Sequence, residues 1–366
     1  MGKSLQYLQR RVHESLNYRL RTFAGGRLAH HCRPADALIL LTENCNAKCV
    51  HCDIWKNTFR EDNAMADHWK RTLTDLREWL GPIHVYFTGG EALMKPFAPE
   101  VVSHAVDLGL FVEFLTHGYW EDQTKIERLA LTNPWRITIS LDGIGDTHTN
   151  VRRRPKFWER SHRSFQTLLR MRKEHGLSYQ IRLKTVIMSQ NYQEVAEVAR
   201  FASRYENVHS FYQAIEQNYN TPEDSRWFEH SDNWIRDTEG VVAVVQNLIK
   251  LKREGLAIDN TYDQLEAMIP YFRDPDASRI AIQTHTAHES RAVCNALASL
   301  QLQANGDVTV CTGQPPVGNI TTSPIRAIWE NRPHFWEKGC CLERRCSLVE
   351  LQTKQLSPAE PVSAKQ

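Results

Sequence analysis

Short apolar runs alternate with longer amphipathic stretches through the first part of the chain. Six runs have the length of buried strands: 37–42, 83–88, 110–116, 135–142, 179–188 and 208–214. A helix is predicted over 67–79, with one apolar face made of Trp69, Leu73, Leu76 and Trp79. Alternating strands and helices indicate βαβ units, whose right-handed crossovers roll a parallel sheet toward a barrel. Six units fall short of a full eight-stranded barrel, so the pattern predicts an α/β fold with a partial (β/α)6 TIM-like barrel.

The pattern changes after the sixth run. Helices are predicted over 234–254, with Gly255 as the stop, and over about 261–272. A hairpin is predicted over 300–312, turning at Asn305-Gly306. The expected organisation is an N-terminal helical extension, a partial barrel, a helical connection, a cysteine-rich module and a disordered tail: 1–35, 36–230, 231–289, 290–351 and 352–366.

The carboxyl ends of the predicted strands carry polar groups. In barrels of this kind, functional residues lie at those ends. The side chains of Ser140 and Asp142 point to the same side by strand alternation. We expect the following positions to line the site: Thr42 with the loop after it, Gly89-Gly90-Glu91, Thr116-His117-Gly118, Ser140-Leu141-Asp142 and Gln213.

Composition restricts the class of protein. Hydrophobic residues make up 41% of the 366 residues and charged residues 24%, which allows a globular core. The net charge of +2 argues against a large nucleic-acid surface. The chain lacks an apolar run long enough to span a membrane and a signal-peptide core, so we expect a cytoplasmic protein. Its nine cysteines then indicate metal ligands or reactive thiols rather than disulfides, with Cys32 a separate thiol.

Cys45, Cys49 and Cys52 form a C-x3-C-x2-C loop directly after the first strand. Thiolates are soft ligands for zinc, copper(I) or iron–sulfur clusters. Three thiolates on a four-iron cluster leave one iron open to a substrate or cofactor. The alternative is a zinc knuckle with His51 as the fourth ligand, whose position next to Cys52 makes the geometry poor.

The cysteine loop, read as CNAKCVHC, resembles that of the radical S-adenosylmethionine (SAM) superfamily, and the resemblance spans about residues 36–215. It implies a [4Fe–4S] cluster whose open iron binds SAM, and reductive cleavage of SAM to a 5′-deoxyadenosyl radical that abstracts a substrate hydrogen. It also implies a reductant of the flavodoxin or ferredoxin type.

The resemblance assigns roles to further motifs. TGGEALM carries Gly89, Gly90 and Glu91, which in the family hold the methionine amino group of SAM. ISLDG carries Ser140 and Asp142, which approach the ribose or the methionine end. A polar strand end that caps the next turn is the alternative for Asp142.

Four further features remain open. His117 stands where relatives often carry asparagine. Arg182, or less favoured Lys184, could face the cofactor carboxylate, with structural ion pairs as the alternative. Residues 213–217, with Gln213, Glu216 and Gln217, could face adenine or substrate or form a solvated strand end. The basic run 152–156 reads as a solvated turn with some potential to contact an anionic substrate.

A second group of cysteines follows the predicted hairpin. Residues 290–348 resemble the SPASM/twitch extension of radical SAM enzymes, which carries auxiliary iron–sulfur clusters. Five cysteines suffice for one auxiliary [4Fe–4S] cluster, and Cys340 could substitute for its neighbour. The alternative is a structural four-cysteine zinc site. The ligands assigned are Cys294, Cys311, Cys341 and Cys346.

These features predict a radical SAM oxidoreductase that oxidises or epimerises a small polar metabolite, of the sugar or aminocyclitol type, in secondary metabolism. The small molecule is favoured because the 35 residues before the barrel are too few for a leader-peptide-binding domain. A peptide-modifying maturase is the first alternative. A non-catalytic iron–sulfur or zinc scaffold is the alternative from another class.

Overall fold

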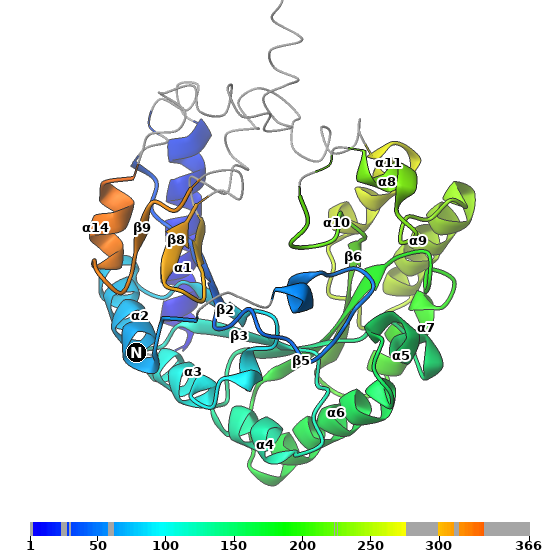
Figure 1. Ribbon diagram of the computed structural model, residues 1–366, viewed down its shortest axis with the longest axis horizontal. Helices are drawn as coiled ribbons and strands as arrows, with labels where there is room; N and C mark the ends of the chain where they lie inside the picture. The colour runs from blue at the N-terminus through cyan, green and yellow to red at the C-terminus, as the bar shows by residue number, and fades with distance from the viewer. Residues whose placement is uncertain are drawn as a thin grey trace, which may run out of the picture.

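The computed structural model describes residues 3–22, 28, 31–57, 62–222, 224, 226–275, 299–310 and 315–332. Within these residues the chain forms one sheet of nine strands in the order β6-β5-β4-β3-β2-β1-β7-β8-β9. The first six strands pair in chain order and are all parallel: β1 (Asp36–Leu40), β2 (His84–Thr88), β3 (Phe111–Thr116), β4 (Arg136–Ser140), β5 (Gln180–Ile187) and β6 (Val208–Ala214). The partial, unclosed barrel predicted from the sequence is therefore confirmed (Figure 1).

Helices cover the outer side of the sheet, so that the inner side faces the open centre (Figure 1). Those between the strands are α2 (Ala66–Leu80), α3 (Ala98–Asp107), α4 (Thr124–Leu131), α5 (Asp146–Arg152), α6 (Phe157–Glu174) and α7 (Val195–Ala202). The chain begins with α1 (Lys3–Thr22) and continues past β6 with α8 (Trp227–His230), α9 (Thr238–Arg253), α10 (Tyr262–Glu266) and α11 (Met268–Arg273). Two 3-10 turns, η3 (Ile54–Lys56) and η4 (Ala92–Met94), lie in strand-to-helix loops.

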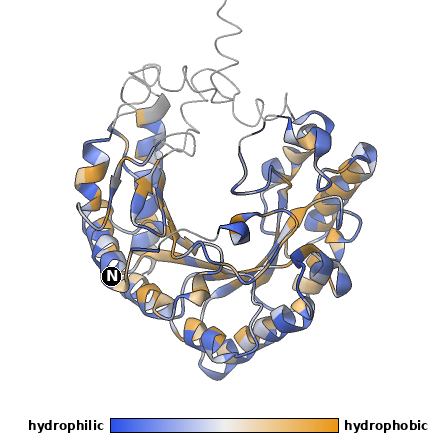
Figure 2. Cartoon of the chain, in the orientation of Figure 1, coloured by the Kyte–Doolittle hydropathy of each residue, from blue (hydrophilic) through white to orange (hydrophobic). Residues whose placement is uncertain are grey.

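The sheet has one apolar and one polar face. Val85, Phe87 and Phe114 are fully buried against the helices, as the period-two pattern requires. Figure 2 shows hydrophobic residues along the strands and a mixture of hydrophobic and hydrophilic residues along the helices around them. The inner face carries polar side chains in adjacent register, among them Glu113, Arg136 and Arg182. The barrel interior is therefore a polar space.

The predicted hairpin extends this same sheet. β7 (Ser299–Leu302) pairs parallel with β1, β8 (Asp307–Thr309) returns antiparallel, β9 (Gly318–Asn319) follows, and α14 (Ile325–Glu330) packs on α2. The turn contains Gly306 at φ +90°, a conformation that glycine adopts without strain. The hairpin was expected in a separate module, but it continues the barrel sheet beside β1.

Two helix predictions need correction. The segment 261–272 forms α10 and α11 rather than one helix, because Pro270 lacks the N–H that would bond to the carbonyl four residues earlier. Helix α9 begins at Thr238 because the Asp237 side chain caps it by accepting from the Gly240 amide. Among the described helices, none has the length and apolar character to cross a membrane.

Candidate active site

Cys45, Cys49 and Cys52 lie together on the loop after β1. They pack around Ala47 and Phe157, and none is in a disulfide. Burial raises the pKa of Cys45 to about 12 and that of Cys52 to about 11, and it also raises the pKa of Cys49. Thiols in this environment stay protonated at neutral pH unless a metal binds the thiolate.

The donor set fits an iron–sulfur cluster better than a zinc ion. Within the part of the chain that the structure describes, no three histidine, cysteine, aspartate or glutamate side chains are arranged to hold one metal ion. A four-iron cluster bonds each thiolate to a different iron, so its ligands need not converge on one point. His51, the fourth ligand of the alternative zinc knuckle, lies near the charged groups of Asp142, Arg152 and Lys184, and desolvation of its ring lowers its pKa to about 4.

Backbone hydrogen bonds hold the cysteine loop in place. The Lys48 and Val50 amides donate to the carbonyls of Arg152 and Val151 at 3.2 and 3.0 Å, which joins the loop to the end of α5. The Arg154 Nε donates to the Asn46 carbonyl at 2.9 Å. These hydrogen bonds hold the backbone of the cysteine loop in place without a contribution from a ligand.

Two glycines bring the end of β2 against the same loop. The Gly90 amide donates to the Thr42 carbonyl at 2.8 Å, and the Glu91 amide donates to the Asn44 carbonyl at 2.9 Å. A Cβ on Gly89 would lie 2.2 Å from the Thr42 carbonyl oxygen, and one on Gly90 would lie 2.3 Å from that of Asn44. Only glycine permits this approach.

Glu91 lies buried where β2 and β3 end. Its carboxylate accepts hydrogen bonds from the Thr116 hydroxyl at 2.8 Å and from the amides of His117 and Leu93 at 2.9 and 3.2 Å. Burial raises its pKa to about 7 despite these bonds. His117 is the residue that stands where relatives often carry asparagine. Its ring Nε2 lies 2.8 Å from Asn46 Oδ1, and this contact links the cysteine loop to the end of β3.

Asp142 is fully buried after β4 and belongs to a chain of contacts that leads to the cysteines. One carboxylate oxygen accepts from the Val186 amide at 3.0 Å, and the other forms an ion pair with Arg152 Nη2 at 2.6 Å. Arg152 Nη1 in turn donates to Cys49 Sγ at 3.3 Å. Burial acts against ionisation, but the guanidinium lowers the pKa of Asp142. Sequence reasoning missed this role because Arg152 opens a basic run that reads as a solvated turn.

Arg182 and Lys184 both face the barrel interior from β5, but their surroundings differ. Arg182 Nη1 donates to Glu113 Oε1 at 3.1 Å, and the same guanidinium pairs with Asp259. Lys184 lies one inward position closer to the strand end, beside Ser140 on β4. Its ammonium has no ion pair with any described residue, and burial lowers its pKa. Arg182 therefore takes part in structural ion pairs, which is the alternative that the sequence left open. Of these two residues, Lys184 is the one whose charge is available to a ligand carboxylate.

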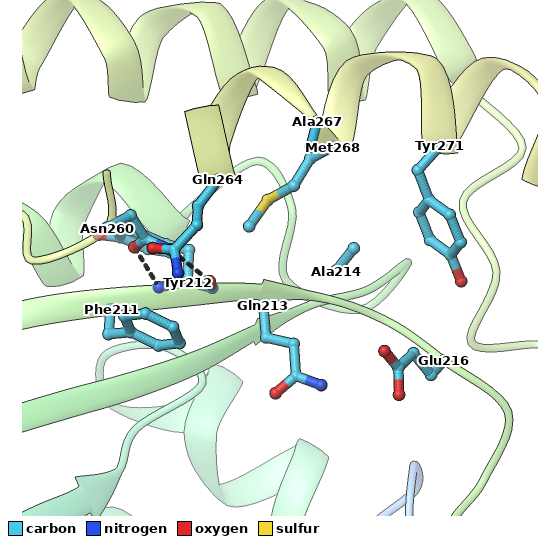
Figure 3. Close-up of a pocket in the computed structure, with 10 residues that line it drawn as sticks. All are labelled: Phe211, Tyr212, Gln213, Ala214, Glu216, Asn260, Gln264, Ala267, Met268 and Tyr271. Carbon is cyan, nitrogen blue, oxygen red and sulfur yellow. Dashed lines mark hydrogen bonds between the residues drawn. The ribbon is translucent and has the colours of Figure 1, made fainter. Parts of the chain in front are cut away.

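A pocket of about 290 Å³ lies where β6 meets α10 and α11 (Figure 3). Gln264 and Met268 extend from the helices toward the strand that carries Phe211 and Gln213, and Tyr271 closes one side. Gln213 and Glu216, which sequence reasoning placed near adenine or substrate, both line this pocket. Its mixed apolar and amide lining suits an organic group rather than an ion.

The second group of cysteines lies outside the described residues. This applies to the four assigned ligands and to the alternative ligand: Cys294, Cys311, Cys341, Cys346 and Cys340. The predicted tail, 352–366, also lies outside them. Cys32 is buried, and its Sγ lies 3.6 Å from the Asn17 carbonyl oxygen.

Comparisons with known proteins agree with this geometry. Residues 39–202 match the family model described as the radical SAM superfamily. The AdoMet-dependent heme synthase of Methanosarcina barkeri is 24% identical over 307 residues, which are 81% of this chain and 82% of that protein. The PqqA peptide cyclase of Streptomyces rochei is 34% identical over 109 residues, 30% of each chain.

The fold also matches solved structures. Streptococcus suis SuiB bound to S-adenosylmethionine superimposes with a TM-score of 0.62 at 15% identity, over 86% of this chain and 71% of that one. Members of the radical SAM superfamily use a [4Fe–4S] cluster and SAM, which the three-thiol loop and the polar strand ends accommodate. The family match over the βα units, together with the cysteine loop after β1, shows that residues 39–202 form a radical SAM domain.

Proposed function

We propose that Cys45, Cys49 and Cys52 hold the [4Fe–4S] cluster of this radical SAM enzyme. The observation that carries the proposal is the meeting of three thiols outside any disulfide, one buried and two half-buried, on a loop that backbone hydrogen bonds hold after β1. When bound, the cluster and SAM supply an electron and a 5′-deoxyadenosyl radical that takes a hydrogen atom from the substrate. The chain positions the reactants and keeps them from water.

The methionine end of SAM would lie against Gly89, Gly90, Glu91 and Ser140. Lys184 supports this placement because it offers a positive charge to the carboxylate beside Ser140. Arg182 is the less suitable partner, since it already pairs with Glu113 and Asp259. Asp142 holds Arg152, so its contribution to cofactor binding would be indirect.

We propose a peptide as the substrate. Three observations support it: the 34% identity with a PqqA peptide cyclase, the fold shared with SuiB bound to its precursor peptide SuiA, and the fold shared with anSMEcpe bound to the Cp18Cys peptide. Among the described residues the sheet does not close on itself, and an unclosed barrel can admit an extended chain. The pocket beside β6 would hold a substrate side chain between Phe211 and Met268.

A tetrapyrrole is the second candidate. The longest curated match described above is a heme synthase, and the Fe-coproporphyrin III synthase of the same organism is 29% identical over 113 residues. The small polar metabolite and the flavodoxin- or ferredoxin-type reductant expected from the sequence stay predictions.

An auxiliary cluster on Cys294, Cys311, Cys341 and Cys346 is also proposed. The hairpin supports it, because antiparallel pairing of β7 and β8 brings residues 299 and 310 to the same end. Cys311 follows that end directly, and Cys294 precedes it by a few residues. The fold shared with SuiB and anSMEcpe is consistent with such an extension.

The cluster assignment is tested by iron and sulfide content and by 5′-deoxyadenosine formation with dithionite under anaerobic conditions. Cys49→Ala should lose both the SAM-cleaving activity and about four irons. Cys32→Ala is the matched control, because it removes a buried cysteine outside the loop and should change neither. Full cleavage activity in Cys49→Ala would refute the assignment.

The substrate class is tested by deuterium transfer into 5′-deoxyadenosine. Three probes are compared: a proteolytic digest of uniformly deuterated protein, deuterated glucose, and iron coproporphyrin III. A peptide substrate predicts deuterium enrichment with the digest alone. Ala267→Leu, which narrows the pocket from α10–α11, should lower the enrichment, whereas Glu266→Ala on the adjacent exposed position should not. Cleavage stimulated by iron coproporphyrin, without enrichment from the digest, would refute the peptide proposal.

A further inference from the structure

Arg152 is the last residue of α5 and lies behind the cysteine loop rather than in solvent. Only 7% of the residue is exposed. Its guanidinium forks between two partners, with Nη1 at 3.3 Å from Cys49 Sγ and Nη2 at 2.6 Å from Asp142 Oδ2. A planar guanidinium can make both contacts at once, which a lysine ammonium cannot do in the same geometry.

The position of this guanidinium is fixed from both sides. The Arg152 carbonyl accepts from the Lys48 amide, so the backbone of Arg152 is hydrogen-bonded to the same cysteine loop that its side chain contacts. Asp142 is itself held, because its carboxylate accepts from the Val186 amide and its own amide donates to His148 Nδ1. A guanidinium also keeps its positive charge throughout the ordinary pH range.

Hydrogen bonds to cluster sulfurs and nearby positive charge favour the reduced, more negative state of an iron–sulfur cluster. The effect is large where water is excluded, because a buried charge is poorly screened. Cys49 is the most buried of the three ligands proposed, with 8% exposure. The sulfur that water reaches least is therefore the one that receives the guanidinium.

We propose that Arg152, held by Asp142, is a positioning residue that raises the reduction potential of the cluster through its hydrogen bond to Cys49 Sγ. The inference rests on the proposed cluster site. It adds a specific electrostatic role, that of making the first electron easier to accept. It also gives Asp142 a function in orienting the guanidinium rather than in touching SAM.

The test is a redox titration of anaerobically reconstituted, full-length protein, followed by the electron paramagnetic resonance signal of the reduced cluster. Arg152→Gln removes the charge while leaving the backbone bonds to Lys48 and Val50. We expect an unchanged iron content and a more negative midpoint. At one fixed potential near the wild-type midpoint, the ratio of reduced to oxidised cluster should fall about tenfold, which is about 59 mV for one electron.

Arg154→Gln is the matched control. It removes a neighbouring guanidinium that bonds to the same loop through the Asn46 carbonyl, without touching a cysteine. Its midpoint should match the wild type. Arg152→Lys, which keeps the charge but not the fork, should give an intermediate midpoint and replaces Arg152→Gln if that variant fails to fold.

Two results overturn different statements. An unchanged midpoint in an iron-loaded Arg152 variant overturns the role of Arg152, as does an equal shift in Arg154→Gln. Full iron content and an unaltered reduced-cluster signal in Cys49→Ala overturn the cluster site instead. The two failures are therefore distinguishable.

Discussion

Replacing Arg182 should destabilise the protein without weakening the binding of SAM. Arg182 belongs to a balanced group of two cations and two anions in the barrel interior, completed by Arg136, Glu113 and Asp259. Arg182→Met leaves two carboxylates facing one guanidinium. The Glu113 side chain is only 4% exposed, so one of these charges is left uncompensated in the interior.

The size of the effect follows from this burial. Breaking a buried ion pair from one side costs about 3–5 kcal/mol. Asp259 is 26% exposed and gains some solvation, which places the cost near the lower bound, at about 3 kcal/mol. With an unfolding entropy of about 2.1 cal/mol/K per residue over 366 residues, the melting temperature should fall by roughly 4 °C.

The assay combines thermal unfolding with SAM affinity measured by equilibrium dialysis on the iron-loaded enzyme. The double variant Arg182→Met/Glu113→Gln restores charge balance and should recover part of the lost stability. Lys184→Met should show the opposite behaviour, with weaker SAM binding and a melting temperature within about 1 °C of wild type. A tenfold loss of SAM affinity in Arg182→Met at unchanged stability would show that the reasoning is wrong.

Two more predictions concern the loop after β2. Gly90→Ala should lower iron content and SAM cleavage, because its Cβ would collide with the Asn44 carbonyl; Gly176→Ala, where the space is open, should cost only about 1–2 kcal/mol of strain. Burial raises the pKa of Glu91 from 4.5 to about 7, so the folded state binds more protons and stability falls as pH rises between these values, by about 3 kcal/mol. Urea unfolding of cofactor-free protein at pH 5 and pH 8 should show this loss relative to Glu91→Gln, and parallel pH profiles would contradict it.

Local signals in the sequence were sufficient to predict the barrel. A buried parallel strand is an apolar run, and each of the six runs became a strand within two residues of its expected ends. The carboxyl ends of parallel strands meet at one edge, so the polar groups after them were expected to meet. The contacts of Glu91 with Thr116 and His117 show that they do.

Long-range pairing was beyond the reach of the sequence. Arg182 and Lys184 share one strand face and the same periodicity, and their roles are separated by the ion pairs of Arg182 with Glu113 on β3 and with Asp259 on a later loop. β7 joins β1 across more than 250 residues, and nothing in an alternating pattern specifies which sheet edge a hairpin will extend. These arrangements depend on tertiary packing rather than on local preference.

The polar residues of the interior divide into two layers by the way their charges are compensated. In the lower layer, away from the carboxyl ends of the strands, arginines and carboxylates of β3, β4 and β5 neutralise one another, together with Asp259. At the carboxyl ends of the strands, Lys184 has no ion pair with any described residue. There, Arg152 donates from one of its two terminal nitrogens to the Cys49 sulfur. An ion pair that is complete has little affinity left for a ligand, whereas a buried cation without one binds anions strongly. Ligand chemistry should therefore be confined to the upper layer, and substitutions in the lower layer should alter stability alone.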